Sequence, residues 1–99
     1  MADPREQLRA EALAAIDSVL RSELQLDRPA RPEDQLAADL QLDSVSLLTL
    51  VVELENRFRV ALREEDAAQV KTVADLAALV ATRALEARTG AAADGGAQP

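Results

Sequence analysis

The sequence predicts an all-α fold: a small four-helix bundle of three longer helices and one short third helix, with a long first loop. Three stretches carry apolar residues at the spacing that places them on one face of a helix. Residues that favour helix starts open these stretches, and prolines interrupt the chain between the first and the second. Ninety-nine residues are enough for one domain with a small core.

The first helix is predicted over about residues 4 to 24. Asp3, Pro4 and Glu6 provide a cap, a proline at the first helical position and an acid three residues beyond the cap. Residues 25 to 42 then form a long connection, because Pro29 and Pro32 prevent a continuous helix. We expect a short helical turn near residues 33 to 38, and leucines that fasten the loop across the bundle: Leu26, Leu36, Leu40 and Leu42.

The second helix, predicted from Ser44 to about Arg59, has apolar residues on two faces. At about 100° per residue, the core face holds Leu47, Leu50, Val51, Leu54 and Phe58. Roughly opposite lie Val45, Leu48 and Val52, beside Thr49 and Glu53. Either another segment of the chain covers these outer aliphatics, or single exposed aliphatics here have no function, or the three form a docking patch for a partner.

Asp43 and Ser44 open this helix, and both residue types satisfy free N–H groups at a helix start. A serine hydroxyl there lies in the positive field of the helix N-terminus, where a phosphodiester is well placed. Ser44 is therefore either a plain helix cap or a modification site.

The remaining helices follow from local patterns. Residues 63 to 69 suit only one or two helical turns, with acids near the start. Thr72 to Asp75 resembles a capping box, and the fourth helix then runs to about Arg88. Residues 89 to 99 show no periodic pattern, so we expect a domain over residues 1–88 and a disordered tail over 89–99.

The composition argues against an enzyme and against a metal site. Cysteine and histidine are absent, which removes disulfides, thiol nucleophiles and imidazole bases, and argues against zinc. Asp43 cannot by itself activate Ser44, and a serine–lysine arrangement would need Lys71, the only lysine. The acidic residues also lack the spacing and the central glycine of an EF-hand. We predict no catalytic residues and no metal.

The net charge of −7 disfavours nucleic acid and anionic membranes as partners. It favours enzymes with basic surfaces, or merely keeps a small protein in solution. Neither a signal peptide nor a membrane span is evident in the sequence. We therefore expect a cytoplasmic monomer, and the Met1 start and the tail suggest a free-standing protein, although an excised domain is an open alternative.

Several stretches together resemble the acyl carrier protein family, in which an Asp-Ser pair begins the second helix. Asp43-Ser44 follows Asp39 to Leu42, and the similarity continues through residues 53–55, Phe58 and Leu62. It reaches residues 64–67, where the family has a short acidic third helix, and residues 70–73, where it has a Thr-Val start to the fourth. The resemblance covers roughly residues 5 to 87, and these motifs at family spacing are far more specific than Asp-Ser alone.

The resemblance implies a carrier function. Ser44 would carry 4′-phosphopantetheine, whose thiol holds an acyl group as a thioester, and Asp43 would cap the helix and help to present the serine. This would explain thiol chemistry in a protein without cysteine. The implied partners are a phosphopantetheinyl transferase and acyl-loading, synthase and tailoring enzymes. Family positions that contact such partners match Val45, Leu48 and Val52, and we add the neighbouring Thr49 and Glu53 to the predicted docking residues.

The chain departs from the family pattern in its loop, its helix and its charge. The family commonly has glycine where Gln41 stands and leucine where Val45 follows the serine. Ser46 and Thr49 replace acids typical of fatty-acid carriers, while basic residues occupy the far end of the helix: Arg57, Arg59 and Arg63. We infer docking that is less electrostatic along the helix and more apolar near Val45 and Val52, and a specialised carrier for a polyketide, hybrid or other secondary pathway.

Other interpretations remain open on the sequence. Within the family, the alternative is an aminoacyl or peptidyl carrier. From a different class comes a non-catalytic helical adaptor with an unmodified Ser44, which would use Val45, Leu48 and Val52 only to bind a partner. A hydrolase would turn over substrate without any added transferase.

Overall fold

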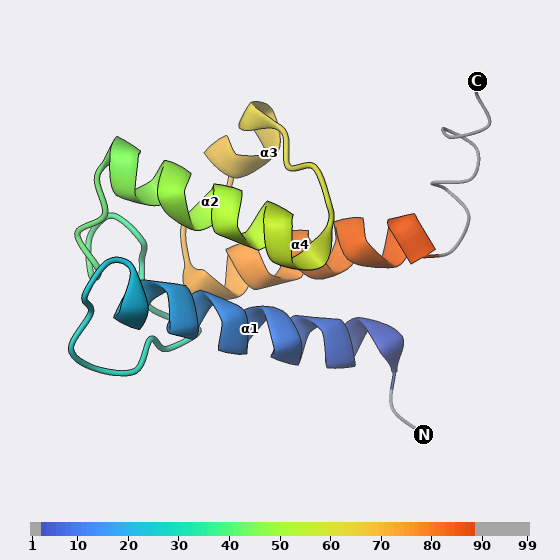
Figure 1. The fold of residues 1–99 in the computed structure, drawn as a ribbon, viewed down its shortest axis with the longest axis horizontal. Helices are drawn as coiled ribbons and strands as arrows, with labels where there is room; N and C mark the ends of the chain where they lie inside the picture. Colours follow the sequence, from blue (N-terminus) through green and yellow to red (C-terminus); the bar gives the residue numbers. More distant parts are fainter. Residues whose placement is uncertain (1–2, 89–99) are drawn as a thin grey trace.

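The computed structural model describes residues 3–88, which form four helices (Figure 1). These are α1 (Pro4–Ser22), α2 (Ser44–Phe58), α3 (Glu64–Ala68) and α4 (Val73–Arg88). The predicted all-α fold with one short third helix is confirmed, and the predicted helix ends lie within two residues of those observed. The tail predicted over residues 89–99 lies outside the described residues.

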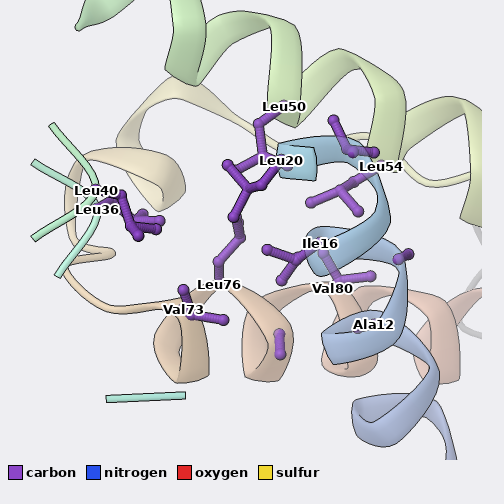
Figure 2. Close-up of a cluster of buried hydrophobic side chains, with 13 residues drawn as sticks. Ala12, Ile16, Leu20, Leu36, Leu40, Leu50, Leu54, Val73, Leu76 and Val80 are labelled. Carbon is purple, nitrogen blue, oxygen red and sulfur yellow. The ribbon is translucent and has the colours of Figure 1, made fainter. Parts of the chain in front are cut away.

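Three long helices enclose a core of aliphatic side chains. α1 packs along α4, and α2 lies over this pair, with α3 beyond it (Figure 1). Ile16, Leu20, Leu54 and Leu76 are fully buried or nearly so, and Figure 2 shows them meeting between the three helices. The predicted inner face of α2 is confirmed: Leu50, Val51 and Leu54 are buried, and Leu47 and Phe58 are half-buried and pack against the core.

The long loop between α1 and α2 is attached to the core by the leucines that the sequence singled out. Leu36 and Leu40 are buried, while Leu26 and Leu42 are half-buried against the same cluster. The expected helical turn lies slightly later than predicted and does not become a helix. The N–H groups of Asp39 and Leu40 both donate to the Gln35 carbonyl, at 2.9 and 3.0 Å.

The same loop completes the start of α4. The N–H of Val73 donates to the Asp34 carbonyl at 2.9 Å, and that of Ala74 to the Pro32 carbonyl at 2.8 Å. These N–H groups have no partner within their own helix, so the loop satisfies donors that a helix start leaves free. Thr72 and Asp75 add the predicted reciprocal pair, because the Asp75 N–H donates to the Thr72 hydroxyl and the Thr72 N–H donates to the Asp75 carboxylate, both at 3.1 Å.

Within residues 3–88, Asp34 is the one polar residue that is buried, and its side chain stabilises the loop between α1 and α2. Its carboxylate accepts two hydrogen bonds from the Arg28 guanidinium, at 2.9 and 3.2 Å, and one from the Arg31 N–H at 2.7 Å. The Arg28 side chain, followed by the Arg31 N–H, lowers the pKa of this carboxyl. These hydrogen bonds stabilise the loop, which connects the end of α1 to the start of α2 and contacts the start of α4.

None of the helices within residues 3–88 is long and apolar enough to cross a lipid bilayer.

Candidate attachment site and docking face

Ser44 is the first residue of α2, and its position is set by Asp43. Asp43 has an extended backbone (φ −87°, ψ −177°), and its carboxylate accepts a hydrogen bond from the Ser46 N–H at 2.8 Å. The Leu47 N–H donates to the Asp43 carbonyl at 2.9 Å, which starts the helical hydrogen bonding. The structure thus has Asp43 as the N-cap and leaves Ser44 exposed on the first turn.

The Asp43 carboxylate accepts hydrogen bonds from the first turn of α2. The N–H and then the hydroxyl of Ser46 hold the pKa of the Asp43 carboxyl below its usual value. A carboxylate with a lowered pKa is a weak proton acceptor, so Asp43 is poorly suited to deprotonate the neighbouring serine. The hydroxyl of Ser44 consequently depends on an outside base for any reaction as a nucleophile.

Gln41 lies two residues before this cap with a positive φ of 56°. This left-handed region favours glycine, which is the residue that carrier proteins commonly have here. The next residue is secured by a hydrogen bond from the Leu42 N–H to the Leu36 carbonyl at 3.0 Å. The loop therefore turns sharply at Gln41 even though the sequence supplies no glycine there.

The start of α2 also suits a bound phosphodiester. α2 is 15 residues long, and its first turn contains no acidic residue. The positive end of the helix dipole is therefore not cancelled beyond the cap, and an anion on Ser44 would be favoured there. The residues present fit a phosphopantetheine group on this serine.

A groove between α2 and the segment containing α3 begins at Ser44, with a volume of about 370 Å³. Leu47, Leu48 and Val51 line it from α2, and Leu62 and Ala67 line it from the other side. The Glu55 carboxylate accepts a hydrogen bond from the Leu62 N–H at 2.8 Å and so ties the two sides together. The sequence analysis missed this groove, because periodicity assigned Leu47 and Val51 to the core face and could not show how far α3 stands from α2.

The three outer aliphatics of α2 are exposed: Val45 at 73%, Leu48 at 62% and Val52 at 42%. No segment within residues 3–88 buries them, which leaves two interpretations: single exposed aliphatics without a function, or a docking patch for a partner. Thr49 and Glu53 are half-buried on the same helix, and the Thr49 hydroxyl donates to the Val45 carbonyl at 3.0 Å. An apolar strip therefore runs along α2 directly beside Ser44.

Comparison with known proteins places this fold and site in a family. Residues 14–80 match the family model described as the phosphopantetheine attachment site. An acyl carrier protein of Myxococcus xanthus is 35% identical over 68 residues, which cover 68% of this chain and 86% of that protein. The acyl carrier protein MbtL of Mycolicibacterium paratuberculosis is 35% identical over 86 residues, covering 86% of this chain and 92% of that protein.

A solved structure agrees with these relatives. It is a candidate acyl carrier protein from Mycobacterium tuberculosis, with a TM-score of 0.67 and 35% identity, and the match covers 72% of this chain and 96% of that one. The fold and the site thus define a protein with a phosphopantetheine attachment domain. More particularly, the chain belongs to the acyl carrier protein family, whose members are carriers for other enzymes and not catalysts themselves.

Proposed function

We propose that Ser44 is the residue that carries 4′-phosphopantetheine and that the protein presents acyl intermediates to the enzymes of a specialised pathway. The observation that carries this proposal is the exposed Ser44 hydroxyl on the first turn of α2, within the segment that matches the attachment-site family. Ser46, the next serine, is half-buried, and its N–H and hydroxyl are turned toward Asp43.

Each residue at this helix start has a distinct part in the proposal. Asp43 fixes the first turn, on which Ser44 is exposed to an approaching phosphopantetheinyl transferase. The transferase provides the base that the chain lacks. When bound, the prosthetic group supplies a thiol on which an acyl group is held as a thioester.

The apolar strip of Val45, Leu48 and Val52 provides the surface on which partner enzymes dock. Exposed aliphatics one turn from the modified residue let a partner bind the carrier while it reacts with the arm. Thr49 and Glu53 extend the surface at its edge. The expected partners are the transferase and the acyl-loading, synthase and tailoring enzymes of one pathway.

A specialised pathway is supported by the composition of this docking surface. Apart from Asp43, the acids near Ser44 that are typical of fatty-acid carriers are replaced by Ser46 and Thr49. A surface with more apolar and less charged character selects different partners. Two mycobacterial relatives bear the separate name MbtL, in keeping with carriers distinguished by pathway.

The test is the intact mass of the protein after incubation with coenzyme A and a broad-specificity phosphopantetheinyl transferase. Wild type and Ser46→Ala should gain the mass of one phosphopantetheine, and Ser44→Ala should gain none. Circular dichroism of each variant establishes that it is folded. Loading of Ser44→Ala, or no loading of folded wild type by a transferase active on a control carrier, would overturn the proposal.

If folded wild type is not loaded by an active transferase, the adaptor is favoured, which binds partners through α2 with an unmodified serine. The cargo is tested separately. The transferase loads the unmodified protein from acyl-CoA or aminoacyl-CoA analogues, and each loaded form is then offered to candidate partner enzymes. Preferential processing of aminoacyl groups would replace the acyl assignment with an aminoacyl or peptidyl carrier.

A further inference from the structure

α2 and the loop after it carry opposite charges at their two ends. Residues 43–55 contain three acids and no basic residue, whereas residues 57–63 contain three arginines and no acid. Arg57, Arg59 and Arg63 are all exposed. The far end of the docking helix is therefore locally basic, in a chain whose net charge is −7.

These three guanidinium groups are not used to hold the fold together. The ion pairs within residues 3–88 use Arg21, Arg28 and Arg83, whereas Arg57, Arg59 and Arg63 pair with no residue in that range. Two of the nearby acids are engaged elsewhere: Glu55 accepts from the Leu62 N–H, and Asp66 pairs with Arg83.

Local structure does not favour arginine at two of the three positions. Arg57 lies in the last turn of α2, where a cation complements the helix dipole. Arg59 has a left-handed backbone (φ 55°, ψ 50°), which glycine or asparagine adopts more readily. Arg63 occupies the N-cap of α3, makes no capping hydrogen bond and places positive charge at the positive end of a helix. Two of the three arginines thus stand where folding gains little from them.

Two of the arginines lie beside the apolar strip of Val45, Leu48 and Val52. Arg59 is the C-cap of α2, seven residues or about 10 Å after Val52, at the end of the same side of the helix. Arg63 and Leu48 line the same groove. Arg57, five residues after Val52, lies about 140° away around the helix and is not part of this surface. A protein that covers the strip would therefore also meet Arg59 and Arg63.

We propose that the partner enzyme that docks on α2 carries an acidic patch opposite Arg59 and Arg63, next to an apolar socket for Val45, Leu48 and Val52. This inference rests on the proposed function, since it assigns the partner of the same surface. The net charge of −7 repels such a partner at long range, while the exposed arginines attract it at contact. Glu64 and Glu65, exposed at the start of α3, set the limit of the patch on that side.

The probe is a pair of synthetic amphipathic helical peptides with leucines along one face. One peptide carries glutamates at one end of that face, and the other carries lysines at the same positions. Binding to the unmodified protein is followed by the amide shifts of Val45, Leu48 and Val52 in ¹H–¹⁵N NMR spectra at low salt. The test variant is Arg59→Gln/Arg63→Gln, and the matched control is Arg21→Gln/Arg31→Gln, which makes the same charge change at the end of α1 and in the loop after it.

The glutamate peptide should shift these amides in wild type, and its Kd should rise about 3- to 10-fold in the test variant, as expected for two exposed charge pairs. The control variant should change this Kd by less than about twofold, because distant charges are screened. The lysine peptide should bind the test variant at least as tightly as wild type. Equal weakening of both peptides, equal effects of the two variants, or no amide shifts with the glutamate peptide would overturn the inference.

Peptide binding and phosphopantetheine loading are independent measurements, and the peptide titration on Ser44→Ala should match that of wild type. If wild type binds the glutamate peptide as expected but is not loaded with phosphopantetheine, the proposed function alone is overturned. Normal loading with no dependence on the arginines would overturn the acidic partner alone.

Discussion

Replacing Gln41 with glycine should stabilise the protein, although glycine usually destabilises a loop. Gln41 has φ 56°, and a left-handed backbone costs a residue with a Cβ about 1–2 kcal/mol. Glycine removes that cost but adds about 0.4–1 kcal/mol of conformational entropy to the unfolded chain. At the middle of these two ranges the net gain is about 0.8 kcal/mol in the free energy of unfolding, or about 3–6 °C in Tm for a domain of this size.

Gln69→Gly is the matched control, because Gln69 has an ordinary φ of −92°. The same chemical change there relieves nothing and should cost about 0.4–1 kcal/mol. Both variants are compared with wild type by urea and thermal unfolding, followed by far-UV circular dichroism. If Gln41→Gly destabilises the protein as much as Gln69→Gly does, the backbone at Gln41 is not strained and the reasoning is refuted.

Three further predictions concern the core, a helix cap and pH. Leu54→Ala should lower the free energy of unfolding by about 2–5 kcal/mol in urea titrations, because Leu54 is fully buried between three helices. Thr72→Ala should cost about 1 kcal/mol in the same assay, since its hydroxyl accepts from the Asp75 N–H at the start of α4. Stability should also fall in acid. The Arg28 side chain lowers the pKa of Asp34, the Ser46 N–H that of Asp43, and the Lys71 N–H that of Asp75. Their stabilisation is present above the unfolded aspartate pKa of about 3.9 and is lost as the pH falls through the lower folded values.

Each of these has an outcome that would contradict it. Leu48→Ala is the control for the core, because Leu48 is exposed on the same helix and its loss should change stability by less than about 0.5 kcal/mol. Equal costs at positions 48 and 54 would place the core elsewhere. Thr72→Ser should keep the capping hydrogen bond. If Thr72→Ser is as unstable as Thr72→Ala, the hydroxyl at position 72 does not stabilise the start of α4. A urea midpoint that does not decline between pH 5 and pH 3 would show that the three carboxylates are not stabilised as described.

The helices could be predicted from the sequence because their signals are local. The spacing of Leu50, Val51 and Leu54 marks the buried side of α2, and the same angular argument leaves Val45 and Leu48 on the outside. Capping residues marked the starts of α1, α2 and α4. Such patterns depend on residues within one or two turns of each other, so they can be recognised in the sequence without knowledge of the rest of the fold.

Features that depend on contacts distant in sequence could not be read in advance. The hydrogen bonds from Val73 and Ala74 to the long loop join segments some forty residues apart, and nothing local in Pro32 or Asp34 announces them. The burial of Asp34 likewise arises only once Arg28 folds over it. The groove beside Ser44 depends on how Leu62 is tied to Glu55.

The most direct test of the central claim is to locate the modification within the chain. Trypsin, which does not cleave before proline, releases residues 22–57 as one peptide containing Ser22, Ser44 and Ser46. Fragmentation of this peptide after transferase treatment should assign the phosphopantetheine to Ser44. Its assignment to Ser22 or Ser46 would contradict the account, because it would show that the exposed first turn of α2 is not the attachment site.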